Sequence, residues 1–228
     1  MLHHRFIRLS AYAVVGLVIG AQFAMPDARA DGDPARGAVL SKTCASCHGE
    51  AGKAPIDGYP LLSGQKLRYL VKQLKGMRQS AMQNAGMLSE DKRHITRITR
   101  ATRSNDIMDP YVINLNDQEI LDVATYYSTL NCQQEIGLAP TAPPKTEVRC
   151  RACHGRVGIS KRDTIPNIAG QDVRYLIEQL KAFHAAANDT GLNENAKRRA
   201  PIMASQAKYL TESDIIAMAE YYGRLPCN

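Results

Sequence analysis

Two five-residue segments of this 228-residue chain combine two cysteines with a histidine. Residues 44–48 read CASCH, and residues 150–154 read CRACH. Thiols and an imidazole at such short spacing can bind a metal, form a disulfide, exchange electrons as a dithiol pair, or attach a haem. Whichever chemistry applies, the chain encodes it twice.

The C-x-x-C-H pattern is typical of covalent haem attachment. Two thiols bond to the vinyl groups of one haem, and the histidine that follows is placed beneath the iron as an axial ligand. The two motifs therefore predict two covalently bound haem c groups, each with one iron. The predicted thioether anchors are Cys44, Cys47, Cys150 and Cys153, and the predicted proximal ligands are His48 and His154.

Other uses of paired cysteines fit this sequence less well. A structural zinc site needs four convergent ligands, whereas the two cysteine pairs lie 106 residues apart. A thioredoxin-like redox pair needs a βαβ setting, and no segment has the alternating hydrophobicity of a strand. Disulfides within the motifs are the third alternative.

The two motifs belong to a longer internal repeat. With an offset of 106, the segment YPLLSGQ at 59–65 falls on IPNIAGQ at 165–171. With an offset of 95, Leu115 falls on Leu210 and Cys132 falls on Cys227. The difference is an insertion of eleven residues in the first copy. Matches at this many fixed spacings indicate a tandem duplication.

Local signals predict an all-α fold for both copies. The pair Asp33-Pro34 opens a helix that runs into the first CxxCH motif. Apolar residues recur on one face of a second helix in each copy. Asn116 with Glu119 predicts a capping box for a last helix over 117–130, and Thr211 with Asp214 is a weaker counterpart. The apolar residues of the second helices are Leu67, Leu70, Val71 and Leu74, and Val173, Leu176, Ile177 and Leu180.

The first thirty residues have the layout of a secretory signal peptide. Arg5 and Arg8 precede an apolar run that is shorter than the roughly 20 residues of a membrane span, so an anchor is the less favoured alternative. We predict cleavage after Ala30, a periplasmic location, and no transmembrane segment in the mature chain. The predicted organisation is a signal peptide at 1–30, a first domain at 31–136, a proline-rich linker at 137–146 and a second domain at 147–228.

The sixth iron ligand decides whether such a haem carries electrons or performs chemistry. The repeat favours Met108 and Met203, because each lies seven residues before its matching leucine; Met203 is expected in a loop. Both could instead be core residues, and the first copy also offers Met77, Met82 and Met87. Met218 is interpreted as part of the last helix. His94 and His184 match under neither offset and are interpreted as surface residues.

These segments together resemble the dihaem cytochrome c4 family. The resemblance rests on CASCHG and CRACHG, YPLLSGQ and IPNIAGQ, YLVKQLK and YLIEQLK, and LNDQEILDVATYY and LTESDIIAMAEYY, and it covers nearly all of the mature chain. It implies two tandem class-I cytochrome c domains related by pseudo-twofold symmetry, with His/Met-ligated haems. It also implies that the carbonyl groups of Pro60 and Pro166 accept hydrogen bonds from Nδ1–H of the haem histidines.

The expected function is electron transfer between redox proteins, for example from a donor to a membrane oxidase, with no catalytic residues. One alternative is a cytochrome subunit dedicated to a periplasmic dehydrogenase, and a less favoured one is a dihaem enzyme with one open haem. The mature chain has 26 Lys and Arg against 21 Asp and Glu, an excess too modest for a nucleic-acid partner. Within the basic segment 89–103, Arg93, Arg97 and Arg100 recur at helical spacing. We expect a solvated helix there, and a basic docking face is the alternative.

Two cysteines remain after haem attachment. Cys132 and Cys227 occupy equivalent positions just past the last helix of each copy. If the copies pack about a pseudo-twofold axis, as the resemblance implies, equivalent residues near that axis face each other. An internal disulfide, two free thiols and a bond between two molecules all fit the sequence.

Overall fold

The computed structural model describes residues 31–88, 103–132, 142–188, 198 and 200–227. Within these ranges the chain is helical, and its extended pairing is limited to a single bridge between Arg103 and Arg198. None of the helices in these ranges combines the length and the hydropathy that crossing a lipid bilayer requires. The signal-peptide prediction falls on residues outside the described ranges.

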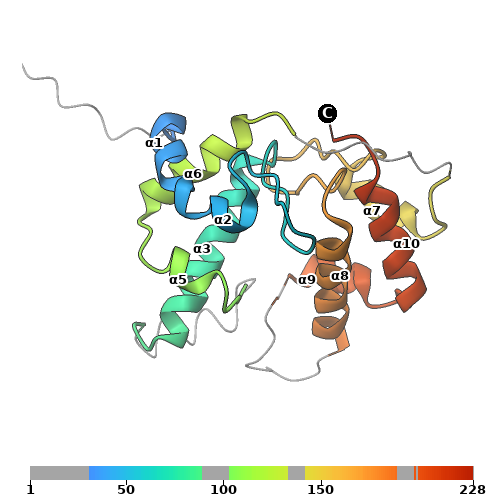
Figure 1. Cartoon of the computed structure of the whole chain (residues 1–228). Helices are drawn as coiled ribbons and strands as arrows, with labels where there is room; N and C mark the ends of the chain where they lie inside the picture. Colours follow the sequence, from blue (N-terminus) through green and yellow to red (C-terminus); the bar gives the residue numbers. More distant parts are fainter. Residues whose placement is uncertain (1–30, 89–102, 133–141, 189–197, 199, 228) are drawn as a thin grey trace, which may run out of the picture. The chain divides into compact units, whose positions relative to one another are not determined.

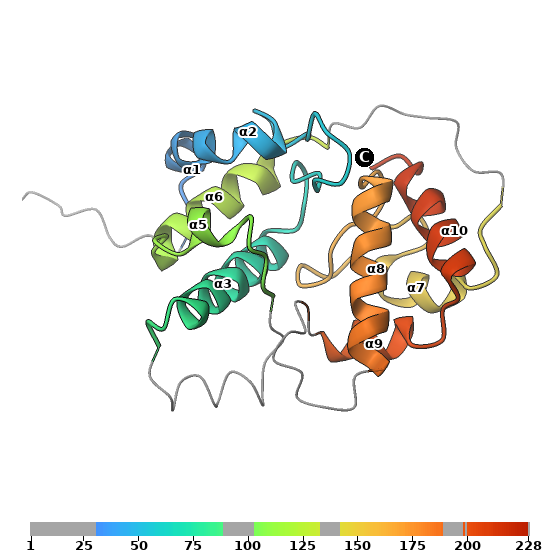
Figure 2. The same cartoon turned by 60° about the horizontal axis from the view of Figure 1, so that its bottom comes forward.

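From the helix that ends in the CxxCH motif onward, the helices follow one another in the same order in both copies (Figures 1 and 2). The first copy contains α1 (Pro34–Leu40), the 3-10 helix η1 (Ser41–Thr43), α2 (Ala45–His48), α3 (Leu67–Asn84), α5 (Asp109–Val112) and α6 (Asp117–Thr129). The second copy contains α7 (Glu147–His154), α8 (Val173–Asn188), α9 (Pro201–Ala207) and α10 (Glu212–Gly223).

The expected helix starts are present. Asp33 accepts hydrogen bonds from the main-chain N–H groups of Ala35 and Arg36, and proline stands at the first helical position of α1. Both α6 and α10 begin with a complete capping box, so the second box is no weaker in form than the first. Two expectations need correction. The helix that enters the first motif is divided into α1, η1 and α2, and Met203 lies inside α9, not in a loop.

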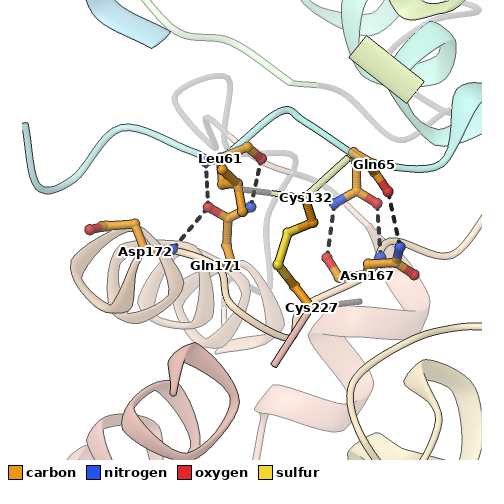
Figure 3. Close-up of a disulfide and its surroundings, with 8 residues drawn as sticks. Leu61, Gln65, Cys132, Asn167, Gln171, Asp172 and Cys227 are labelled. Carbon is orange, nitrogen blue, oxygen red and sulfur yellow. Dashed lines mark hydrogen bonds between the residues drawn. A yellow bond between two sulfur atoms is a disulfide. The ribbon is translucent and has the colours of Figure 1, made fainter. Parts of the chain in front are cut away.

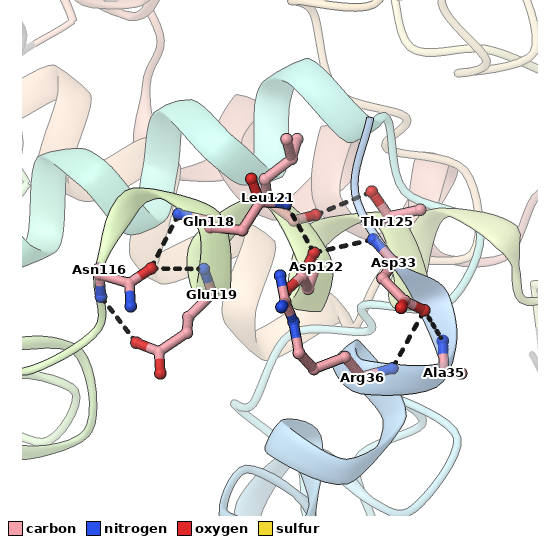
Figure 4. Close-up of polar contacts among 9 residues, drawn as sticks. All are labelled: Asp33, Ala35, Arg36, Asn116, Gln118, Glu119, Leu121, Asp122 and Thr125. Atoms are coloured by element: carbon pink, nitrogen blue, oxygen red, sulfur yellow. Dashed lines mark hydrogen bonds and ion pairs between the residues drawn. The ribbon is translucent and has the colours of Figure 1, made fainter. Parts of the chain in front are cut away.

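A buried carboxylate ties α1 to α6 (Figure 4). The Asp122 side chain has no solvent exposure, and its Oδ1 accepts from the Asp33 main-chain N–H at 2.8 Å and from Gln118 Nε2 at 3.0 Å. Its Oδ2 is paired with Arg36 Nε. Burial pushes the Asp122 pKa upward, but the bonds from Arg36, Asp33 and Gln118 outweigh it and hold the pKa below the usual carboxyl value.

Each copy has its own apolar core, which lies between α3 and α6 in the first copy and between α8 and α10 in the second. In the first copy, Leu70 on α3 packs with Val123, Ala124 and Tyr127 on α6. In the second copy, Leu176 on α8 packs with Met218, Ala219 and Tyr222 on α10. The predicted apolar faces of these helices therefore do face the core, and Met218 is a core residue.

Candidate haem-binding sites

Both CxxCH motifs end a short helix at a glycine. The motif histidines are the last residues of α2 and α7, and each is 5% exposed. Gly49 and Gly155 follow with φ of 74° and 82°, a conformation that residues with a Cβ rarely adopt. The glycine stops the helix directly after the histidine, so the loop that follows can turn back over the imidazole.

The same loop supplies a hydrogen-bond partner for each imidazole. His48 Nδ1 lies 3.2 Å from the Pro60 carbonyl oxygen, and His154 Nδ1 lies 2.9 Å from the Pro166 carbonyl oxygen. Because a carbonyl oxygen only accepts, Nδ1 carries the hydrogen and Nε2 keeps its lone pair. Such a partner fixes the ring orientation and raises the basicity of a metal-ligating histidine.

The other imidazole nitrogen of the first copy is an unsatisfied buried polar atom. Within the described residues, His48 Nε2 is buried and has no hydrogen-bond partner. A buried nitrogen with a free lone pair is costly unless something binds it. Burial lowers the pKa of His48 and of His154, against the effect of the proline carbonyls, and so favours the neutral form that ligates metals. These residues fit a haem iron.

The two motif cysteines of the second copy differ in exposure, whereas those of the first copy are both partly buried. Cys44 and Cys150 pack against the cores of their copies, whereas Cys153 is exposed. Burial raises the pKa of the Cys44 thiol and raises that of Cys150 to about 11. Dithiol redox motifs and thiolate metal sites use thiols of lowered pKa. Cys44 and Cys150 therefore lack the lowered thiol pKa that a redox nucleophile or a thiolate metal ligand has.

Helix α3 in the first copy and helix α8 in the second connect the CxxCH motif to the selected methionine. Leu74 on α3 contacts the cluster that contains Cys44 and also the cluster that contains Met108. Its equivalent, Leu180 on α8, contacts the clusters that contain Cys150 and Met203. Met108 is the N-cap residue of α5, and both methionines are partly buried. The methionines that the repeat selects are therefore also equivalent in space. In each copy, one helix, α3 or α8, contacts both the cluster that contains the first motif cysteine and the cluster that contains the methionine.

The remaining candidate residues lie elsewhere. Met77 is buried in the core between α3 and α5, and Met87 is 58% exposed. His184 is half-buried, so it lies only partly at the surface, and its Nδ1 lies 2.9 Å from the Ala207 carbonyl oxygen. His94 and the three arginines of the basic segment lie outside the described residues.

Two arginines that the motif search missed occupy equivalent places in the two copies. Arg103 and Arg198 each lie five residues before the selected methionine, so the 95-residue offset relates them too. Arg103 donates to Gln73 Oε1 at 2.5 Å and to the Tyr175 hydroxyl of the other copy at 2.8 Å. The offset that selected the methionines could have identified both arginines.

Arg198 makes the reciprocal set of contacts. Its guanidinium is bonded to Gln179 Oε1 in its own copy and donates to the Tyr69 hydroxyl of the other copy at 3.2 Å. The partners described for both arginines are amide and hydroxyl oxygens, which are neutral. Two cations with neutral partners favour a nearby anionic group.

A disulfide joins the ends of the two copies (Figure 3). Cys132 is bonded to Cys227, with the two Cα atoms 5.9 Å apart. Both cysteines pack with Leu61 and Ala169, which come from the loops that carry the histidine-binding prolines. The structure therefore favours the internal pairing among the three possibilities that the sequence left open.

Comparisons with known proteins agree with the tandem arrangement. A family model described as "Cytochrome c" matches twice, over residues 34–131 and 146–224. A cytochrome c4 of Thiocapsa roseopersicina is 29% identical over 218 residues, which cover 89% of this chain and 96% of that protein. A "thiosulfate dehydrogenase electron acceptor" of Stutzerimonas stutzeri is 26% identical over 197 residues, 80% of this chain and 78% of that protein. The crystal structure of reduced recombinant cytochrome c4 from Pseudomonas stutzeri has 27% identity and a TM-score of 0.64, and the match covers 86% of this chain and 100% of that one.

Proposed function

Because this chain belongs to the cytochrome c family, we propose that it carries electrons between redox proteins through two covalently bound haem c groups. The observation that carries this proposal is the repeated site itself. In each copy a CxxCH histidine is buried and bonded through Nδ1 to a proline carbonyl, so that Nε2 is left for iron. Relatives named cytochrome c4 match the chain over most of their length.

The proposed ligand pairs are His48 with Met108 and His154 with Met203. The haems supply a one-electron change at iron, and methionine ligation raises the potential at which it occurs. The protein holds each imidazole in a fixed orientation and covers the site with the second helix of its copy. Pairing with the methionines is supported by their equivalent positions in the repeat and by their packing against the helices that also cover the cysteines.

The arginine pair suits the carboxylates that every haem carries. We assign Arg103 and Arg198 as partners of haem propionate groups, because their described contacts leave the positive charges without a carboxylate. Equivalent placement in the two copies gives one guanidinium for each haem. Each arginine reaches a tyrosine hydroxyl of the other copy, so the same residues also join the two domains.

The proposed mature protein begins after Ala30 and acts in the periplasm. The domains are proposed at 31–136 and 147–228, with the proline-rich linker at 137–146 between them. An oxidising compartment suits both the Cys132–Cys227 disulfide and the attachment of haem to thiols.

A dedicated dehydrogenase subunit is the second candidate. It is favoured by the relative named "thiosulfate dehydrogenase electron acceptor", which matches 80% of this chain. In both cases the chain accepts and passes on electrons without bond chemistry of its own. Stable co-purification with a large catalytic subunit would favour the dedicated subunit, and isolation as a free protein would favour the diffusing carrier.

The ligand assignment is tested by the spectra of purified variants. A pyridine haemochrome assay should find two haems per chain, and the oxidised protein should show the weak red charge-transfer band of methionine-ligated iron. Met108→Ala and Met203→Ala should each remove part of this band and open one haem to carbon monoxide. Met87→Ala is the matched control and should leave the band intact. Loss of the band in Met87→Ala but not in Met108→Ala would contradict the assignment.

A further inference from the structure

One peptide group connects each haem histidine to the other copy. The carbonyl of the Pro60–Leu61 peptide accepts from His48 Nδ1 at 3.2 Å. The N–H of the same peptide donates to Gln171 Oε1, in the second copy, at 2.6 Å. A single rigid peptide unit therefore accepts a hydrogen bond from the histidine on one side and donates a hydrogen bond to the other domain on the opposite side.

The reciprocal arrangement holds the second histidine. The carbonyl of the Pro166–Asn167 peptide accepts from His154 Nδ1 at 2.9 Å, and the N–H of Asn167 donates to Gln65 Oε1 at 2.8 Å. Gln65 belongs to the first copy and is equivalent to Gln171 under the 106-residue offset. The two connections cross between the copies in opposite directions.

Each glutamine amide is held on both of its ends (Figure 3). Gln171 Nε2 donates to the Leu61 carbonyl at 2.9 Å, and Gln65 Nε2 donates to the Asn167 carbonyl at 2.9 Å. Each Oε1 also accepts from the next main-chain N–H of its own copy, that of Asp172 or Lys66, at 3.0 Å. The glutamine side chains are 6–7% exposed, so water does not compete for these bonds.

Hydrogen bonds on the two sides of one peptide polarise each other. An acceptor on the N–H moves electron density toward the carbonyl oxygen, which then accepts more strongly from the histidine. A stronger bond at Nδ1 makes the imidazole a more basic ligand. A more basic ligand stabilises ferric iron over ferrous iron and lowers the midpoint potential.

We propose that Gln171 and Gln65 are positioning residues that tune the potential of the haem in the other domain. Gln171 acts on the haem of the first copy through the Pro60–Leu61 peptide, and Gln65 acts on the haem of the second copy through the Pro166–Asn167 peptide. The proposal rests on the proposed iron ligation by His48 and His154. It gives the geometry shared by the two copies a role in adjusting each haem site through the other domain.

The test uses two near-isosteric variants of the full-length haem-loaded protein. Gln171→Met should raise the midpoint potential of the first-copy haem and leave that of the second-copy haem unchanged. Gln65→Met should raise the midpoint potential of the second-copy haem and leave that of the first-copy haem unchanged. Each potential is assigned by NMR of ¹⁵N-histidine-labelled protein during redox titration, because the two ligand imidazoles report on their own irons. The Nδ1–H resonance of the affected histidine should move with the potential.

The double variant Cys132→Ser/Cys227→Ser is the matched control, since it removes the cross-link at the same interface and leaves both peptide groups and both glutamines untouched. This control should not raise the midpoint potential of one haem alone. A glutamine variant that shifts the haem of its own copy, or both haems equally, overturns the proposal. Either glutamine variant suffices alone if the other does not fold. If neither His48 nor His154 shows iron-induced shifts, the ligand assignment itself fails. If both histidines ligate iron but the potentials do not change in the glutamine variants, only the present proposal fails.

Discussion

The disulfide between the two copies should provide a large part of the stability of this protein. Replacing both Cys132 and Cys227 with alanine removes a cross-link between residues 95 positions apart. In the chain-entropy model, a loop of this length raises the free energy of unfolding by about 4–5 kcal/mol, because the cross-link restricts the unfolded chain. A domain of ordinary stability unfolds at a cost of about 5–15 kcal/mol, so the loss is substantial.

The native contacts around the disulfide do not depend on it. Gln65 and Gln171 bind main chain across the copies, and the Tyr69 N–H donates to the Asp163 carbonyl at 3.0 Å. The folded variant should therefore keep its interface. For this reason we expect the effect to appear as lower stability and not as altered haem spectra. Measured effects of disulfides are often smaller than the model gives, and about 3 kcal/mol is the expected lower end.

Urea unfolding of the haem-loaded protein, followed by circular dichroism, measures the difference. The double alanine variant should unfold at lower denaturant concentration than the oxidised wild type. Wild type treated with a thiol reductant should unfold like the variant, because reduction removes the same constraint without a change of side chain. A difference of less than about 1 kcal/mol would refute the entropic reasoning, since removal of the bond would then add little freedom to the unfolded chain.

Three further perturbations have defined signs. Asp122→Asn should lower the free energy of unfolding by about 1–3 kcal/mol at neutral pH, because it breaks a buried hydrogen-bonded carboxylate. The pKa of Asp122 is lower in the folded than in the unfolded protein. The stabilisation by its carboxylate is therefore complete above the ordinary carboxyl pKa of about 3.9 and disappears as the pH falls through the folded pKa. In acid, wild type and variant should unfold at the same urea concentration. Gly155→Ala should lower the melting temperature, because alanine at a φ of 82° is strained by about 1–3 kcal/mol. The control Gly76→Ala, within helix α3, should be neutral or stabilising. Equal effects of the two substitutions would contradict the argument from backbone conformation. Arg103→Met should lower a haem potential in a redox titration, because a cation near the haem favours the reduced state, and an unchanged or higher potential would count against the propionate assignment.

The parts of the fold that the sequence predicts are those governed by local rules. Capping residues such as Asn116 and Thr211 determine helix starts within a few residues, and the apolar face of α3 follows from its own periodicity. The error at Met203 has the same local origin. Its helix is only seven residues long, and its N-cap residue Ala200 offers no capping side chain, so the start signal is limited to Pro201.

Contacts between the copies follow from the packing of distant segments. The motif containing Gln65 and Gln171 is visible as a repeat, but the sequence does not indicate that each amide binds the main chain of the other copy. The tyrosine partners of Arg103 and Arg198 are equally distant in sequence. Each of these contacts pairs residues more than 70 positions apart, a separation at which neither periodicity nor capping carries information.

One departure from the repeat places different charges beside the two haem sites. The 106-residue offset aligns Glu147 with Ser41, and both side chains are buried. Glu147 Oε1 accepts from the Tyr222 hydroxyl at 3.4 Å, and its Oε2 lies 3.6 Å from Nε of the exposed Arg151. Burial is the larger cause of the raised pKa of Cys150, and the negative charge of Glu147 is the second cause. A negative charge that acts on Cys150 also acts on a haem bound through this proposed anchor.

Glu147→Gln should therefore raise the midpoint potential of the second-copy haem, because loss of a nearby negative charge favours the reduced, less positive iron site. The amide keeps an oxygen that can accept from Tyr222, so the packing of α7 against α10 should survive. The first-copy haem, whose site has the neutral Ser41 at the equivalent position, should keep its potential. A redox titration with the two haems assigned separately measures both values. A lower potential for the second-copy haem, or an equal rise in both, would show that Glu147 does not distinguish the two sites.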